Sequence, residues 1–226
     1  MKMAQTPLLL LLFLQNIIII ESLPTRFGEY NIKVKKTQTL ESIGQDRYFE
    51  QVQDHFDATN LKTWQQRYFI NQTFFDGDGP VFLCIGGEGP PLSALVVVTG
   101  EYHCGWMVIL AQRHRALIVA IEHRFYGPSQ PAPDLSTQYL SKYLSSQQAL
   151  ADIVAFRSYV SSLYGMTHNK WVTFGGSYPG MLAAWSRSKF PHLFHAAVSS
   201  SAPIHAKVPP IRPAPRPSRP AGRLLR

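Results

Sequence analysis

Cysteine is scarce in this chain, and its scarcity excludes two kinds of architecture. Only two cysteines, Cys84 and Cys104, occur among the 226 residues. Two are too few for a small disulfide-held framework, and no cysteine or histidine spacing typical of a metal site is present, so neither a metal nor another cofactor is expected. The two thiols are compatible with one disulfide in an oxidising compartment. A buried free thiol at Cys84, which lies inside an apolar run, is the alternative.

Acidic residues are missing from the last part of the chain, and this explains most of its basic charge. The chain has 22 Lys and Arg against 14 Asp and Glu, a formal net charge of +8. Six of those cations lie in residues 207–226, which contain no acid, so residues 1–206 carry a net charge of only +2. A nucleic-acid surface needs cations clustered on a folded face. Nucleic acid is therefore not expected as a partner, and the proline-rich residues 207–226 are predicted to be disordered.

Long apolar runs are also few, and the one that stands out is at the N-terminus. Residues 7–20 read PLLLLLFLQNIIII and follow Lys2, a pattern typical of a secretory signal peptide. The run is short for a membrane span, so residues 1–22 are predicted to be a signal peptide, with an uncleaved signal anchor as the alternative. No other strong membrane segment follows, and stable membrane insertion is not expected. A sequon at Asn71 is a candidate glycosylation site, consistent with the secretory pathway.

Residues 23–206 are predicted to fold as one α/β domain. Hydrophobic residues make up 45% of the chain and charged residues 16%, as in globular proteins. The first part, residues 23–50, is polar and weakly patterned, which predicts a pro-segment or a loosely packed arm. Five later segments are expected to be strands: residues 63–75, 80–87, 116–124, 171–174 and 195–200.

Helical segments alternate with these strands. Residues 145–165 have apolar side chains at helical spacing, and Ser145 with Gln148 forms a capping-box pattern at the start. A second helix is predicted after Ser177 and is stopped by Pro191. Strands that alternate with helices predict a mostly parallel sheet with helices on both faces.

The segment KWVTFGGSYPG, residues 170–180, carries the main functional signal. It reads as a buried strand running into a glycine-rich turn with Ser177 at its tip, close to the nucleophile elbow Gly-x-Ser-x-Gly. Pro179 replaces the last glycine, but proline is tolerated in the first turn of a helix, where amides have no partner. Ser177 is therefore the predicted nucleophile. The alternatives are that it caps a helix, or that a serine within residues 199–201 reacts instead.

Two groups of backbone amides are candidates for an oxyanion hole. The residue after the nucleophile, Tyr178, keeps its N–H, which would be the first donor. The second is expected from the glycine-rich loop IGGEGPP, residues 85–91, at Gly87 or Glu88. The Glu88 side chain is expected to face the cleft, where it either contacts a substrate amine or pairs with Arg124; the pairing is favoured.

Five blocks in order resemble one family of serine peptidases. They read DHFDATNLKTWQQRYFIN, VFLCIGGEG, AIEHRFYGPSQP, YLSSQQALADI and WVTFGGSYPGMLAAWSRSKFPHLFHAAVSSSAP. Between about Asp46 and Lys207 the chain resembles the family of lysosomal prolylcarboxypeptidase, type-II dipeptidyl peptidase and thymus-specific serine peptidase, and most of all the thymus-specific branch. The resemblance implies an α/β-hydrolase fold, a Ser-Asp-His triad with Ser177 as nucleophile, and exopeptidase action on peptides in a lysosomal, endosomal or secreted setting. In the prolyl-specific relatives the cleaved bond follows proline.

The chain also departs from that family. In this fold the triad follows the order Ser, Asp, His, yet the sequence after Pro203 has no aspartate and is rich in proline. His205 follows the elbow too closely, and His123 lies in a segment, EHRFYG, that resembles a structural part of the family. The helical insertion and the last strands are also missing. We therefore expect a truncated, N-terminal half of the sheet with little or no activity.

Three functions remain open from the sequence. The first is a serine-type exopeptidase, either a carboxypeptidase or a dipeptidyl peptidase. The second is a catalytically inactive secreted protein with a hydrolase-like fold, which binds rather than cleaves. The third is an esterase or lipase of the same fold, which the five matching blocks disfavour. The oligomeric state is not set by the sequence.

Overall fold

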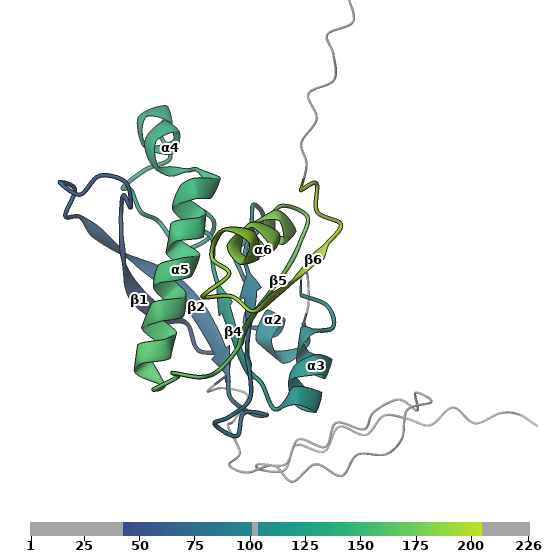
Figure 1. Cartoon of the computed structure of the whole chain (residues 1–226). Helices are drawn as coiled ribbons and strands as arrows, with labels where there is room; N and C mark the ends of the chain where they lie inside the picture. Colours follow the sequence, from purple (N-terminus) through teal and green to yellow (C-terminus); the bar gives the residue numbers. More distant parts are fainter. Residues whose placement is uncertain (1–42, 101–103, 205–226) are drawn as a thin grey trace, which may run out of the picture.

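Six strands form a single mixed sheet in a computed structural model that describes residues 43–100 and 104–204. The strands follow the order β1-β2-β4-β3-β5-β6 (Figure 1). Their bounds are β1 Arg47–Val52, β2 Thr63–Asn71, β3 Val81–Ile85, β4 Leu117–Ile121, β5 Trp171–Gly176 and β6 Ala196–Ser200. The sheet between helices confirms the predicted α/β class, and the strand–turn–helix unit at its centre makes it a partial α/β-hydrolase fold. The predicted signal peptide and tail lie outside the described residues.

Burial explains why the central strands are almost purely apolar. Every residue of β3 and β4 is buried, and the two strands pair in parallel with Leu83 opposite Val119. β5 and β6 continue the parallel part, whereas β1 and β2 are antiparallel. A strand covered on both faces has no polar side to show in its sequence. The apolar runs at 80–87 and 116–124 are therefore confirmed as central strands.

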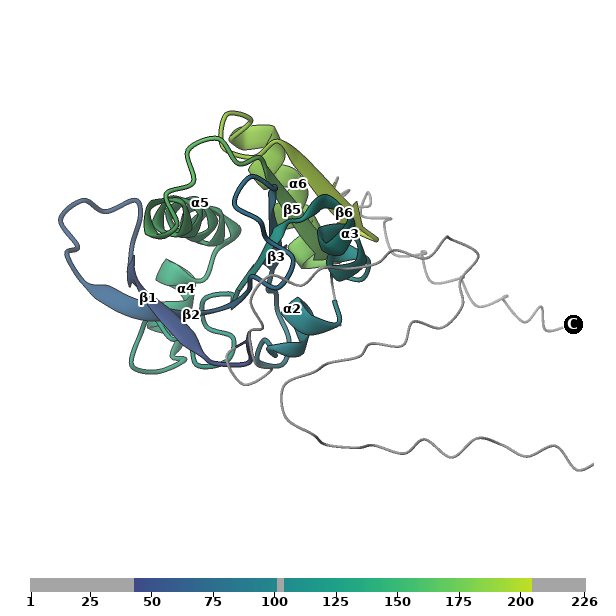
Figure 2. The ribbon, with the colours of Figure 1, turned by 90° about the horizontal axis from the view of Figure 1, so that it is seen from below.

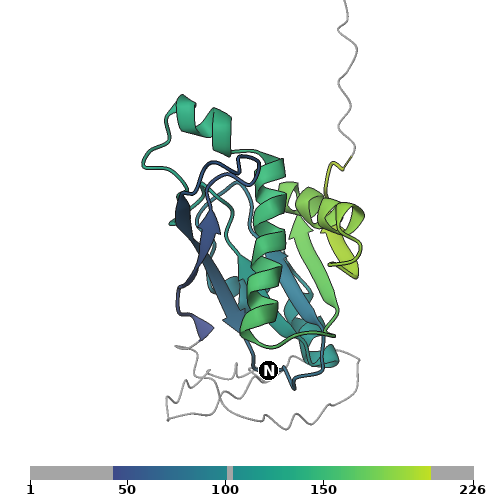
Figure 3. The ribbon, with the colours of Figure 1, turned by 60° about the vertical axis from the view of Figure 1, so that its left-hand side comes forward.

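Helices cover both faces of the sheet. One core cluster joins the sheet to α5 (Ser146–Leu163) and α6 (Tyr178–Lys189), and a second joins it to α2 (Leu95–Val98) and α3 (Met107–His114). Figure 2 shows α5 and α6 on one side of the sheet and α2 on the other, and Figure 3 shows α5 running along it. A short helix, α4 (Thr137–Tyr143), packs beside Phe125 in a third, smaller cluster.

Only one of the two hydrogen bonds of the predicted capping box forms at the start of α5. The Ser145 hydroxyl accepts a hydrogen bond from the Gln148 amide at 3.2 Å, as expected for an N-cap. The Gln148 side chain does not turn back to Ser145. It donates to Asp54 Oδ1 at 2.6 Å and accepts from the His55 amide at 3.0 Å. The helix start is thereby tied to the loop between β1 and β2.

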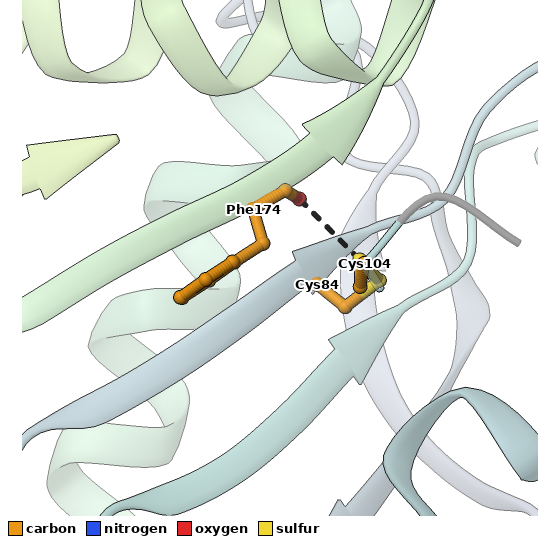
Figure 4. Close-up of a disulfide and its surroundings, with 3 residues drawn as sticks. All are labelled: Cys84, Cys104 and Phe174. Carbon is orange, nitrogen blue, oxygen red and sulfur yellow. Dashed lines mark hydrogen bonds between the residues drawn. A yellow bond between two sulfur atoms is a disulfide. The ribbon is translucent and has the colours of Figure 1, made fainter. Parts of the chain in front are cut away.

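The two cysteines form a disulfide, so the free-thiol alternative for Cys84 is wrong. Cys84 belongs to β3, and Cys104 lies just before α3, with 5.9 Å between their Cα atoms. Figure 4 shows the bridge beside β5, where Cys104 Sγ lies 3.7 Å from the Phe174 carbonyl oxygen. The bridge fixes the start of α3 to the centre of the sheet.

One prediction from the sequence needs correction here. The segment 23–50 is not all a loosely packed arm, because β1 begins at Arg47 and buries Phe49 against Tyr68 and Phe156. The candidate glycosylation site, Asn71, is buried. Only 4% of Asn71 is exposed, and its Nδ2 donates to the Val97 carbonyl at 2.8 Å, so the nitrogen that would carry a glycan is engaged within the fold.

A buried ion pair joins the sheet to α5. Arg124, directly beyond β4, is fully buried and bonds Asp152 of α5 through two nitrogens, each at 2.7 Å. Its third nitrogen donates to the Gln53 and Tyr143 carbonyls at 3.2 and 3.0 Å. All the arginine donors are thus directed to β1, α4 and α5 neighbours.

Removal of the Asp152 carboxylate should therefore leave the buried charge of Arg124 without its partner. We expect Asp152→Ala to lower the free energy of unfolding by about 3–5 kcal/mol, the range for one partner lost from a buried pair. Denaturant unfolding of the full-length protein measures this change in the free energy of unfolding. Asp78→Ala is the control, because Asp78 is exposed and should change stability by less than about 0.5 kcal/mol. Equal effects of the two substitutions would contradict the structural role of the pair.

Candidate active site

Ser177 lies at the sharp turn between β5 and α6, with a backbone conformation that few residues adopt. Its φ is 58° and its ψ is −129°, outside the regions that L-residues favour. Such a conformation costs on the order of 1–3 kcal/mol and is found mostly at functional sites. The amide of Ser177 donates to the Ser200 carbonyl on β6 at 2.9 Å, and the residue itself is exposed. The serine is therefore held at the tip of the turn and presented to solvent.

Close backbone contacts explain the small residues of this turn. A Cβ at Gly175 would collide with the carbonyl of Pro179, because the turn folds back on the strand. A Cβ at Gly180 would lie 2.9 Å from Ala202 Cβ and 3.2 Å from the Ser200 carbonyl. Pro179 lies at the first turn of α6, as its missing N–H predicts. The sequence Gly-Gly-Ser-Tyr-Pro-Gly is thus compatible with a tight elbow.

The glycine-rich loop lies directly against the elbow. Gly86 at its start donates to the Ile121 carbonyl of β4 at 2.9 Å. A Cβ at Gly87 would collide with the ring of Pro179, so the loop and α6 are in van der Waals contact. Glu88 follows and is exposed. Of the three positions predicted for an oxyanion hole, Gly87 thus lies against Pro179, the residue after Tyr178, and Glu88 follows it on the exposed side of the loop.

Glu122 anchors the far end of the same loop. Its Oε1 accepts from the Leu92 amide at 2.9 Å, and also from Arg67, with which it forms a buried ion pair. Its Oε2 accepts from the Ser129 amide and hydroxyl at 3.1 and 2.6 Å. One carboxylate therefore fixes the loop relative to β2 and to the segment after β4.

His123 contacts the elbow through Tyr178. Its Nδ1 lies 2.7 Å from the Arg124 carbonyl, which can only accept, so Nδ1 carries the proton. Its Nε2 then accepts from the Tyr178 hydroxyl at 3.0 Å. Burial lowers the pKa of His123, which favours this neutral tautomer. Burial, aided by Tyr126 and Glu88, raises the pKa of Tyr178 to about 12, so the phenol remains a donor.

Sequence reasoning did not identify this contact. His123 was assigned only to a structural segment of the family, and the histidine does lie 5% exposed within the core. The polar run Glu122-His123-Arg124 directly after the apolar strand was the available signal, because buried polar residues at a strand end need partners. Each of the three residues contacts a different element around the elbow.

A pocket opens beside the elbow, with a volume of about 220 Å³. Its walls are residues 86–92, Glu122, His123 and Tyr126. The predicted pairing of Glu88 with Arg124 is wrong, because Arg124 bonds Asp152 and two carbonyls on the far side of the segment. Glu88 instead borders this pocket without an ion-pair partner among the described residues.

No general base contacts Ser177 within residues 43–100 and 104–204. Of the histidines there, His55 bonds Asp152 at 2.8 Å and His123 bonds Tyr178. His205 lies outside the described residues. Of the alternative nucleophiles, Ser199 donates to the Gly180 carbonyl at 2.7 Å, which supports the turn. The described part of the chain holds the elbow and its loop, and no charge relay to Ser177.

In the described ranges, no cluster of three or more His, Cys, Asp or Glu side chains is arranged to hold a metal ion. The helices there are too short or too polar to cross a membrane.

Comparison with known proteins shows similarity to one family of serine peptidases. Residues 51–210 match the family model described as serine carboxypeptidase S28. The chain is 44% identical over 169 residues to the thymus-specific serine protease of Mus musculus and 44% over 161 residues to that of Homo sapiens, matching 74% and 70% of this chain. It is 36% identical over 162 residues, 70% of the chain, to the lysosomal Pro-X carboxypeptidase of Bos taurus.

These matches cover only part of each relative: 32%, 30% and 31% of their respective lengths. The matched region of this chain nevertheless contains strands β2 to β6, the glycine-rich loop and the Ser177 elbow. The chain belongs to the serine carboxypeptidase S28 family of serine peptidases.

Proposed function

We propose that this chain carries the nucleophile and oxyanion hole of a serine exopeptidase. The observation that carries the proposal is the strained Ser177, held at a strand-to-helix turn within a family of serine peptidases. Ser177 Oγ would attack the peptide carbonyl carbon and form an acyl-enzyme as the C–N bond breaks. Water would then release the acyl group.

The oxyanion formed during attack would be stabilised by backbone amides. Tyr178 provides the amide directly after the nucleophile, at the start of α6, where N–H groups lack helical partners. Gly87 or Glu88 provides the second donor, since their loop touches Pro179. The neutral His123 supports this arrangement by holding the Tyr178 side chain.

The proton of Ser177 needs an acceptor, which we propose is a histidine oriented by an aspartate, both placed after the nucleophile in the triad order of this fold. No aspartate follows Ser177 in this sequence, so its residues supply the nucleophile and not a complete triad. Without a base, turnover would fall by a factor of about 10⁴ to 10⁶.

The substrates are proposed to be peptides, cleaved near one end. A relative is named lysosomal Pro-X carboxypeptidase, which supports an exopeptidase of carboxypeptidase or dipeptidyl peptidase type with preference for proline. The Cys84–Cys104 disulfide supports a location in the secretory pathway, in lysosomes or endosomes, or outside the cell, because disulfides persist in oxidising compartments.

A second candidate function is peptide binding without cleavage. The observation in its favour is that Ser177 has no base within the described residues. Both functions use the same elbow and pocket, so the reactivity of Ser177 separates them. An esterase of the same fold has no observation of its own in the structure.

Ser177→Ala should abolish covalent labelling by a fluorophosphonate probe in the longest protein that the gene encodes, because the probe needs an activated serine oxygen. The thermal unfolding midpoint should change little, since the residue is exposed. Ser200→Ala is the control and should still label. Labelling that survives in Ser177→Ala but is lost in Ser200→Ala would move the nucleophile to β6, and no labelling of the wild type would favour the binding function.

Gly87→Ala should lower kcat by a factor of about 10² to 10³, the loss typical of one missing oxyanion donor. The added Cβ would collide with Pro179 and push the loop away from the elbow. Gly89→Ala is the matched control, because a Cβ there meets no atom within 4 Å and should cause a far smaller loss. Steady-state kinetics on a peptide reporter measures both. Equal losses would contradict the role of the Gly87 contact.

A further inference from the structure

The pocket beside the elbow has a place for part of a substrate. Its wall is the same loop that touches Pro179, and His123 in the opposite wall bonds Tyr178. Two residues of the pocket wall, Gly87 and His123, therefore contact the two residues that follow Ser177. At about 220 Å³ the pocket is smaller than the roughly 300–1,000 Å³ of most ligand sites, so it suits the end of one residue rather than a whole ligand.

The charges around the pocket leave one carboxylate without a partner. The negative charge of Glu122 is matched by Arg67, with which it is paired. His123 is neutral because it is buried and its Nδ1 proton is committed to a carbonyl. Burial raises the pKa of Tyr178 to about 12, so its phenol keeps the proton. Glu88 is thus the one carboxylate of the pocket wall without an ion-pair partner among the described residues.

Arg124 does not neutralise Glu88. The arginine belongs to the same segment as His123 but is fully buried, and its donors go to Asp152, Gln53 and Tyr143. Asp152 matches its charge. The charge of Arg124 is thus already compensated by Asp152.

We propose that this pocket is a subsite for a protonated amine of a peptide substrate, with the Glu88 carboxylate as its counter-ion. The proposal rests on the proposed function and names a determinant of its specificity. A hydrogen bond between an ammonium and a carboxylate is about twice as strong as a neutral one. The Tyr126 ring in the pocket wall adds an aromatic face, which attracts cations.

Two substrate groups have this chemistry: the α-amino group at a peptide N-terminus and the side chain of a basic residue. The first would direct cleavage to bonds near the N-terminus, as in a dipeptidyl peptidase. The second would select peptides with lysine beside the cleaved bond.

Binding to a protein that cannot turn over provides the test. The longest protein that the gene encodes is prepared with Ser177→Ala, and calorimetry measures its affinity for three peptides: alanyl-proline amide, its N-acetyl form, and N-acetyl-lysyl-proline amide. Addition of Glu88→Gln should weaken binding of an amine-bearing peptide by at least about tenfold, the loss typical of a charged hydrogen bond, and leave the N-acetyl-alanyl peptide unchanged.

The matched control is Glu50→Gln, which removes an exposed glutamate of β1 away from the pocket and should leave all affinities unchanged. Circular dichroism and thermal unfolding verify that each variant is folded. If Glu88→Gln is unstable, Glu88→Asp keeps the charge and should retain most of the affinity for the amine.

The pattern of binding identifies the amine. Tighter binding of alanyl-proline amide than of its acetyl form supports the α-amino group, and tighter binding of the lysyl peptide supports a side chain. Equal affinity of all three peptides, or an effect of Glu88→Gln on the acetyl form alone, overturns the subsite. Labelling of wild-type Ser177 is read separately, so a protein that labels but shows no amine preference refutes the subsite while leaving the serine peptidase proposal intact.

Discussion

The position of residues 122–124 constrains the whole site, because three consecutive buried polar side chains at the end of β4 each hold a different element. Glu122 fixes the glycine-rich loop, His123 holds the ring of Tyr178, and Arg124 pairs with α5. A backbone that satisfies all three has little freedom to move. Each of these groups would be costly to bury without its partner. The segment therefore links packing in the sheet to geometry at the elbow.

The ion pair that stabilises the fold and the carboxylate proposed to bind substrate lie in different parts of the structure. Arg124 and Asp152 lie in the dry layer between the sheet and α5, where their charges are fully desolvated. Glu88 lies in a different connection, the exposed glycine-rich loop after β3, where its carboxylate borders the pocket. Buried charges with complete partners specify one packing of the core, whereas an exposed carboxylate without a partner can bind a cationic ligand. The connections after the neighbouring strands β3 and β4 thus serve different needs.

Sequence reasoning identified the elements whose pattern is local. The apolar runs of β3 and β4, the capped α5 and the turn at Ser177 are all confirmed as elements, because burial on both faces, helical period and glycine spacing each leave a mark on neighbouring residues. It missed features that depend on distant partners. β1 has polar residues and is positioned by its pairing with β2. Asn71 has the sequence of an exposed sequon, but α2 covers it in the fold. The sequence alone does not show which of many carboxylates pairs with Arg124.

The hydrogen bond between Ser177 and Ser200 has a consequence for the order in which the protein is made. The elbow conformation is unfavourable by itself, and the amide of Ser177 is satisfied only by a carbonyl of β6, which is synthesised more than twenty residues later. While the ribosome is still adding α6, the serine turn has no such partner and is free to relax. The reactive geometry therefore arises late, after β6 has left the ribosome and paired with β5. Until that moment a nascent chain has the serine but lacks the bond that holds its elbow conformation.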